Sequence, residues 1–208
     1  MIKIIHGELY SADFSKLNQL VKLYSSCTRF AYNRFYKYFK LHHSNLDFND
    51  EVRQVSKQVY HELTARHVSD AVNEGKALFT RFQEKKVIFG SKQLFYQRKN
   101  LKIDHDTFIN LRDSHLYARG DKARSGNPNI RIVDKNEVND YLRITMSPKN
   151  YEFYKLFIPT RYQHDLHNLL ASQQSYNIRL IKKDPTHYRV IIDYQVPTIP
   201  IHINFDNG

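Results

Sequence analysis

The stretch YNIRLIKKDPTHYRVIIDYQV, residues 176–196, contains two runs, 176–183 and 187–196, in which apolar and polar residues alternate. Alternation of this kind is typical of strands that bury one face. Three earlier runs have the same texture: IRIV at 130–133, YLRITM at 141–146 and FYKLFIP at 153–159. A short helix at roughly 161–171 separates the third run from the fourth. The last third of the chain therefore predicts closely spaced antiparallel strands.

A first strand is expected at the opposite end of the chain. Residues 2–5, IKII, form a short apolar run rich in β-branched side chains, and Gly7 ends it. A lone strand needs a sheet to join, and the later strands are the only candidates. We therefore expect an α+β fold in which residues 1–10 and 130–198 form a small antiparallel β-barrel. Residues 11–129 are expected as a helical insertion after the first strand.

Helical periodicity covers much of this insertion. From Asp13, an N-cap candidate, apolar residues recur at three- and four-residue steps to about Leu41, and a second such stretch covers about 50–83. Gly75 is a candidate for a kink in the second stretch. The periodicity weakens between 85 and 128, where ARGDKARSGNPN concentrates turn formers and arginines. That part is predicted as a loop or flexible connection.

The composition argues against several classes of protein. A single cysteine, Cys27, allows neither an internal disulfide nor a cysteine-based zinc site, and a reducing compartment fits best. The N-terminus MIKIIHGELY is unlike a secretory leader, and no window of about 18 apolar residues occurs. We therefore expect a cytoplasmic protein that does not enter a membrane.

The charge balance points to a polyanionic partner. The chain has 32 Lys and Arg against 21 Asp and Glu, a formal net charge of +11, together with 15 Tyr and 13 Phe. Cations neutralise phosphates, and flat rings stack on exposed bases. The alternative is a solvated lysine-rich surface around a core that holds most of the rings.

One segment combines both features most clearly. KKVIFGSKQLFYQRKNLK, residues 85–102, has six Lys or Arg and no acid, with Phe89, Phe95 and Tyr96 between them. It predicts a contact with RNA or another single strand, whereas its plainer interpretation is a solvated loop anchored by its rings. The first predicted helix adds cations at positions 29, 34, 37 and 40.

Sequence motifs for catalysis are absent. His61 and His67 are six residues apart, whereas the zinc motif on a helix needs two histidines four residues apart on one face. No phosphate loop, GxGxxG or GxSxG motif occurs. We therefore predict no catalytic residues, no metal ligands and no cofactor in this chain.

Two stretches resemble a known family. CTRFAYNRFYKYF at 27–39 resembles the R-F-x-Y-N helix of transposon-encoded TnpB (OrfB) proteins, which are relatives of type V CRISPR effector nucleases. VIFGSKQLFYQRK at 87–99 resembles their FGGKKxFxxR segment, and the order of features continues through NIRIV at 129–133 to IDYQVPTI at 192–199. The resemblance spans most of the chain.

The resemblance implies a wedge-type, OB-like barrel and a helical recognition lobe that bind a guide RNA and its heteroduplex with target DNA. Protein contacts would read backbone shape while base pairing reads sequence. The residues expected to bind nucleic acid, by motif or by charge, are Arg29, Tyr32, Asn33, Arg34, Lys37, Lys92, Arg98, Lys99, Arg119, Lys122 and Arg124.

The chain departs from the family pattern at its end. Family members continue into a RuvC-like nuclease domain whose three carboxylates hold divalent metal, whereas this sequence ends at INFDNG with the single acid Asp206. One carboxylate cannot build a two-metal site, so we expect no cleavage by this polypeptide alone and Mg²⁺ only with the missing domain. Residues 199–208 are expected as a linker towards that domain, which a separate polypeptide could supply.

Two other functions stay open at this point. A DNA-binding regulator of helix-turn-helix type would dimerise and select a duplex palindrome. A small metal-dependent nuclease that uses scattered histidines and aspartates would cut nucleic acid in magnesium and lose that activity when one carboxylate is neutralised.

Overall fold

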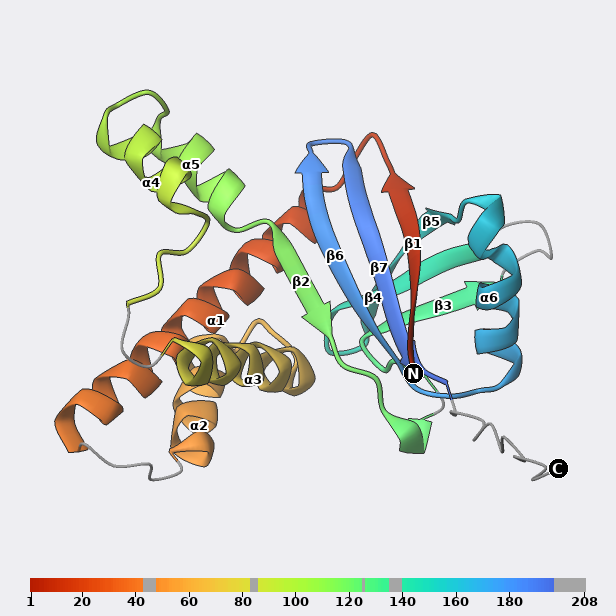
Figure 1. The fold of residues 1–208 in the computed structure, drawn as a ribbon, viewed down its shortest axis with the longest axis horizontal. Helices are drawn as coiled ribbons and strands as arrows, with labels where there is room; N and C mark the ends of the chain where they lie inside the picture. Colours follow the sequence, from red (N-terminus) through yellow and green to blue (C-terminus); the bar gives the residue numbers. More distant parts are fainter. Residues whose placement is uncertain (43–47, 83–85, 125, 135–139, 197–208) are drawn as a thin grey trace, which may run out of the picture.

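The computed structural model describes residues 1–42, 48–82, 86–124, 126–134 and 140–196 (Figure 1). Its elements are, in chain order, β1 (Ile2–Tyr10), α1 (Ser15–His42), α2 (Asn49–Val59), α3 (Ala65–Arg81), α4 (Lys92–Lys99), α5 (His105–Arg112), β2 (His115–Ala118), the 3-10 turn η1 (Lys122–Arg124), β3 (Ile130–Asp134), β4 (Asp140–Ser147), β5 (Asn150–Phe157), α6 (Thr160–Ala171), β6 (Tyr176–Asp184) and β7 (His187–Gln195). The fold is α+β, as the sequence predicted.

The strands form one antiparallel sheet in the order β2-β6-β7-β1-β5-β4-β3. β1 pairs with β7 along its whole length, from Ile2 opposite Gln195 to Tyr10 opposite His187. With β5 it pairs only near its own end, through Glu8 and Leu9. The sheet therefore curls into a half-barrel, and the first strand joins the later ones as expected (Figure 1).

Alternation along the strands gives the sheet one buried face. Ile5 and Leu9 of β1 are fully buried, as are Val190 and Ile192 of β7. Helices complete this core, among them α1 and α6, and α6 contributes Leu166 and Leu169. Phe14 stands just before α1, and the first half of α1 adds Leu17, Leu20, Val21 and Tyr24. The helical insertion is therefore rooted in the core of the half-barrel.

Close packing joins α1 to α3. A Cβ at Gly75 of α3 would lie 2.9 Å from both the carbonyl oxygen of Thr28 and the backbone nitrogen of Tyr32. Only glycine lets the two backbones approach so closely. α3 runs unbroken from Ala65 to Arg81, so the expected kink at Gly75 is wrong.

Two expectations for the insertion need correction. The stretch at 50–83 is not one helix, because α2 ends at Val59 and Thr64 caps a new helix by accepting the backbone N–H of His67 at 3.1 Å. The loop expected between 85 and 128 instead holds α4, α5, β2 and η1. These elements are short and show no clear periodicity in the sequence. Side-chain caps begin the two helices, and β2 forms by pairing with β6. No helix in the described ranges is both long and apolar enough to cross a membrane.

Candidate nucleic-acid interface

The outer half of α1 displays several cations. Asn33 and Lys37 are exposed, while the guanidinium of Arg34 lies 5.1 Å from the centre of the Phe30 ring. The ammonium of Lys40 lies 5.7 Å from the Tyr36 ring. Such cation–ring contacts orient a side chain without neutralising its charge. This helix face therefore retains positive charge for an anionic partner.

Arg29 has a structural contact inside the protein. Its guanidinium pairs with Asp113, whose side chain is only 3% exposed, and Arg112 binds the same carboxylate through Nε at 2.9 Å and Nη2 at 3.2 Å. Burial lowers the pKa of the Arg29 guanidinium, although the carboxylate of Asp113 opposes that shift. Arg29 therefore ties α1 to the end of α5, and the two guanidiniums leave one excess positive charge beside it.

Tyr32 is a packing residue of α1. It is 1% exposed, and its hydroxyl accepts the backbone N–H of Val87 at 3.0 Å. Its ring packs edge-on against Phe89 with centres 5.4 Å apart and stacks with Tyr36 at 6.1 Å. These contacts hold the segment that leads into α4 against the middle of α1.

α4 presents the acid-free basic segment on a defined helix. Ser91 caps it by accepting the N–H of Leu94 at 3.0 Å, and Leu94 anchors it as its buried residue. Lys92 and Lys99 are exposed and Arg98 is half-buried. Two exposed rings, Phe95 and Tyr96, lie on the same helix with centres 5.8 Å apart. Cations and exposed rings thus lie together on one short helix.

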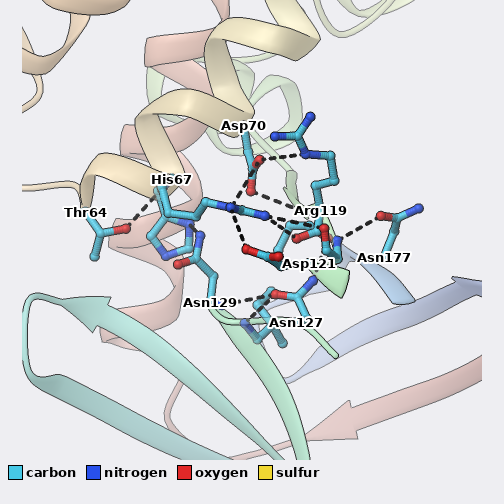
Figure 2. Close-up of polar contacts among 12 residues, drawn as sticks. Thr64, His67, Asp70, Arg119, Asp121, Asn127, Asn129 and Asn177 are labelled. Atoms are coloured by element: carbon cyan, nitrogen blue, oxygen red, sulfur yellow. Dashed lines mark hydrogen bonds and ion pairs between the residues drawn. The ribbon is translucent and has the colours of Figure 1, made fainter. Parts of the chain in front are cut away.

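The basic loop at 119–124 lies elsewhere. Arg119, Lys122 and Arg124 are exposed, and the backbone N–H of Gly120 donates to the side-chain oxygen of Asn177 at 2.9 Å (Figure 2). A Cβ at Gly120 would lie 2.7 Å from the carbonyl oxygen of Tyr176. The loop is therefore clamped to the start of β6.

Further polar side chains fix the same loop from inside. The amide of Asn127 donates to the carbonyl oxygens of Ala118 at 2.8 Å and Tyr176 at 3.3 Å. Arg66 of α3 reaches the carboxylate of Asp121 at 3.3 Å and the carbonyl oxygen of Arg119 at 3.3 Å. The loop therefore connects α3 with the sheet.

A buried polar cluster lies beneath this loop, built around His67 and Asp70 of α3 (Figure 2). His67 Nε2 donates to the carbonyl oxygen of Thr145 at 2.8 Å, and its Nδ1 accepts from the amide of Asn129 at 3.1 Å. Burial lowers the pKa of His67 to about 4. Asp70 accepts the N–H of Arg119 at 3.2 Å, yet burial raises its pKa to about 6 against the nearby arginines. Neither role was predicted from the sequence.

One turn further along α3, Glu74 makes a second set of polar contacts. It accepts a hydrogen bond from the Tyr24 hydroxyl at 3.0 Å and faces His115 Nε2 at 3.3 Å and Arg179 Nη2 at 3.4 Å. Burial alone would raise the pKa of Glu74, but these partners outweigh it and the pKa is lowered. The first half of α3 therefore contacts the sheet and the basic loop through polar groups.

The expected binding residues do not form one patch. Figure 1 shows α4 apart from the outer half of α1, and the basic loop lies at the opposite end of β2, which follows α5. A four-residue strand spans about 13 Å, so the basic loop is also separate from α4. Asp206 lies outside the described residues.

The described residues offer no cluster of three or more His, Cys, Asp or Glu that could hold a metal ion. Burial raises the pKa of the lone thiol, Cys27, to about 12, so it is a packed apolar group in α1.

A family model described as the SSO2105 N-terminal domain matches residues 4–204 of the chain. No curated protein matches the chain.

Proposed function

The chain belongs to the SSO2105 N-terminal domain family, and we propose that it is a nucleic-acid-binding module whose partner is structured RNA. The observation that carries the proposal is the arm, which is α4 together with the segment 86–91 that lies against the middle of α1. There Lys92, Arg98 and Lys99 stand beside the exposed rings of Phe95 and Tyr96, in a segment without a single acid.

This surface suits a phosphate backbone for physical reasons. Each lysine or arginine that neutralises a phosphate releases condensed counterions, which supplies free energy regardless of base sequence. Neighbouring rings add stacking wherever a loop or end exposes a base. The ion pair of Arg29 with Asp113 and the contact of Tyr32 with Val87 support the arm from behind. A preorganised cationic surface loses less conformational entropy when it binds.

We further propose that the module works in a TnpB-like, RNA-guided system, where it binds a guide RNA and the guide–target heteroduplex. Its plan supports this idea, since one strand, a helical insertion and a returning set of strands follow in the order expected for a wedge barrel with a recognition lobe. In this proposal α1 to α5 are the recognition lobe and the half-barrel is the wedge, with OB-like character.

A helix-turn-helix regulator is less well supported. Its recognition helix would have to present polar side chains to a DNA groove. In α3 the polar residues His67 and Asp70 point into the protein, and Gly75 lies against α1. α2 and α3 are therefore poorly placed to serve as such a motif, and we do not adopt this function.

The proposal is tested by replacing Lys92, Arg98 and Lys99 together with alanine. Binding of a structured RNA hairpin is measured by fluorescence anisotropy over a range of salt concentrations. The slope of log K against log salt should become shallower by about 0.9 for each duplex phosphate that the variant no longer neutralises, or about 2–3 in all.

A matched control removes three positive charges elsewhere, from Lys57 on α2, Arg81 at the end of α3 and Lys183 on β6, all of which are exposed. If both triple variants change the slope equally, only net charge matters and the assignment of the arm is wrong. An unchanged slope in the α4 variant would contradict it as well.

A further inference from the structure

A second surface combines rings and cations on the outer face of β3, β4 and β5. Residues on these strands that alternate with buried Leu142, Ile144 and Leu156 point away from the core. Tyr151, Phe153 and Phe157 are 44%, 43% and 58% exposed. The residues of this surface, called the β3–β5 face below, are Arg131, Arg143, Tyr151, Phe153, Lys155 and Phe157.

The sheet register arranges these side chains in rows. Arg131 of β3 lies opposite Arg143 of β4, which lies opposite Phe153 of β5. In the adjacent row Tyr141 lies opposite Lys155. Directly opposed residues on one face have Cβ atoms about 4.5–5.5 Å apart. Each row therefore places a cation of one strand beside a ring of the next at contact distance.

Two opposed arginines have an energetic cost. Like charges at directly facing positions destabilise a sheet, and no acid of the described part of these strands shares their face. Asp140 and Glu152 stand at the alternate positions, and Glu152 pairs with Lys16 of α1. An anion bound between the two arginines would relieve this repulsion.

Neighbouring contacts leave the charges of both arginines available. The Arg143 guanidinium lies 4.7 Å from the centre of the Tyr151 ring, and its Nε has no hydrogen-bond partner within the described residues. Arg131 donates through Nη2 to the carbonyl oxygen of Arg124 at 2.8 Å, a neutral acceptor. This contact also links the face to the basic loop at 119–124.

We propose that the β3–β5 face binds single-stranded nucleic acid. Unpaired bases stack on Tyr151 and Phe153, while Arg131, Arg143 and Lys155 contact the phosphates between them. A duplex keeps its bases stacked inside and cannot offer them to rings on the outer face of a sheet, so the face selects single strands. The inference rests on the proposed function in one respect only, that the partner is nucleic acid, because the residues of the β3–β5 face lie outside α1 and α4.

The chain itself provides a direct probe. It has no tryptophan, so the Phe153→Trp variant contains a single indole, placed on the proposed face. A uridine oligoribonucleotide of about 12 nucleotides is titrated into it while the indole emission is followed. Stacking should quench the emission in a saturable manner. Unchanged emission would overturn the proposal.

A matched control places the indole at Tyr10, an exposed ring of β1 beside the carboxylate of Glu8. The Tyr10→Trp variant should show no saturable quenching with the same oligonucleotide. Equal quenching at both positions would mean that the strand binds without preference for the β3–β5 face, which also overturns the inference.

Affinity measurements separate this inference from the proposed function. The Phe153→Leu variant keeps an apolar side chain without a π-face and should bind the single strand about 5- to 150-fold more weakly, the range expected for one base–ring stack. Its affinity for duplex RNA should not change, whereas the alanine triple in α4 should weaken duplex binding. Loss of duplex binding in Phe153→Leu, or unaltered single-strand binding, would contradict the inference while leaving the α4 test to decide the proposed function.

Discussion

Acidification should destabilise an Asp70→Asn variant far more than the wild type, because His67 and Asp70 respond to pH in opposite directions. The hydrogen bond that Nδ1 of His67 accepts from Asn129 requires the neutral ring, whereas the bond that Nε2 donates to Thr145 does not. Its folded pKa of about 4 lies below the ordinary 6.5. A lowered pKa contributes stability that is present above pH 6.5 and is lost as the pH falls through about 4. At about 1.36 kcal/mol per unit, the loss is about 3 kcal/mol.

Asp70 compensates for this loss in the wild type. Its folded pKa of about 6 lies above the ordinary 3.8, because burial outweighs the contacts with Arg119 and with Arg66, whose Nε is 3.9 Å away. A raised pKa contributes stability that is fully present below about pH 3.8 and is lost as the pH rises through about 6. Protonation of Asp70 on acidification therefore stabilises the folded wild type by up to about 3 kcal/mol. Asparagine cannot take up a proton, so the variant lacks this gain.

The assay is urea unfolding followed by far-ultraviolet circular dichroism between about pH 7 and pH 4. The difference in unfolding free energy between wild type and Asp70→Asn should grow by about 2 kcal/mol as the pH falls across this range. The Asp121→Asn variant, which removes a carboxylate from the partly exposed edge of the same cluster, controls for the loss of one negative charge. Parallel pH dependence of wild type and Asp70→Asn would refute the reasoning.

Two glycine substitutions test the close contacts of the fold. Gly75→Ala should destabilise the protein by about 1–2 kcal/mol in urea unfolding, since the cost of overpacking against α1 exceeds the gain in helix propensity. The control Ala77→Gly, at an exposed site of the same helix, should lower the unfolding free energy by about 1 kcal/mol through helix propensity alone. Stabilisation by Gly75→Ala would show that α1 and α3 are not in backbone contact. Gly120→Ala should lower the unfolding free energy by about 1–3 kcal/mol and displace the basic loop from Tyr176. Loss of hydrogen-exchange protection around Gly120 would reveal the displacement. Unaltered stability and protection would contradict the clamp.

The parts of the fold that periodicity specifies were predictable from the sequence. α1 begins at Ser15 and ends at His42, close to the expected limits, and Asp13 accepts the backbone N–H of Ser15 at 2.7 Å. The returning strands were also expected, because each has one buried face. α4 and α5 were missed, since eight residues are too few for a clear helical period and their caps, Ser91 and Asp104, are individually weak signals.

The candidate site was only partly predictable, because sequence shows charge but not partners. Lys92 and Lys99 are exposed as a contact with nucleic acid requires, whereas Arg29 and Tyr32 have partners far along the chain. His67 drew attention only as a possible metal ligand with His61. Its actual neighbour, Thr145, is 78 residues away and no local pattern connects the two.

The sequence of β5 contains a signal for its exposed rings. In NYEFYKLF, tyrosine and phenylalanine occupy alternate positions at 151, 153 and 157, where a half-buried strand should expose polar side chains. Exposed rings at such positions indicate a surface with a binding role. The register with β4 was needed to show that Arg143 lies beside them.

The most direct test of the central claim is the salt dependence of binding between the purified wild-type chain and a structured RNA hairpin. Our account predicts saturable binding whose log K falls linearly with log salt, with a slope set by several phosphate contacts. Failure to bind the hairpin at low salt, or a dissociation constant that does not change with salt, would contradict the claim that this basic surface binds nucleic acid.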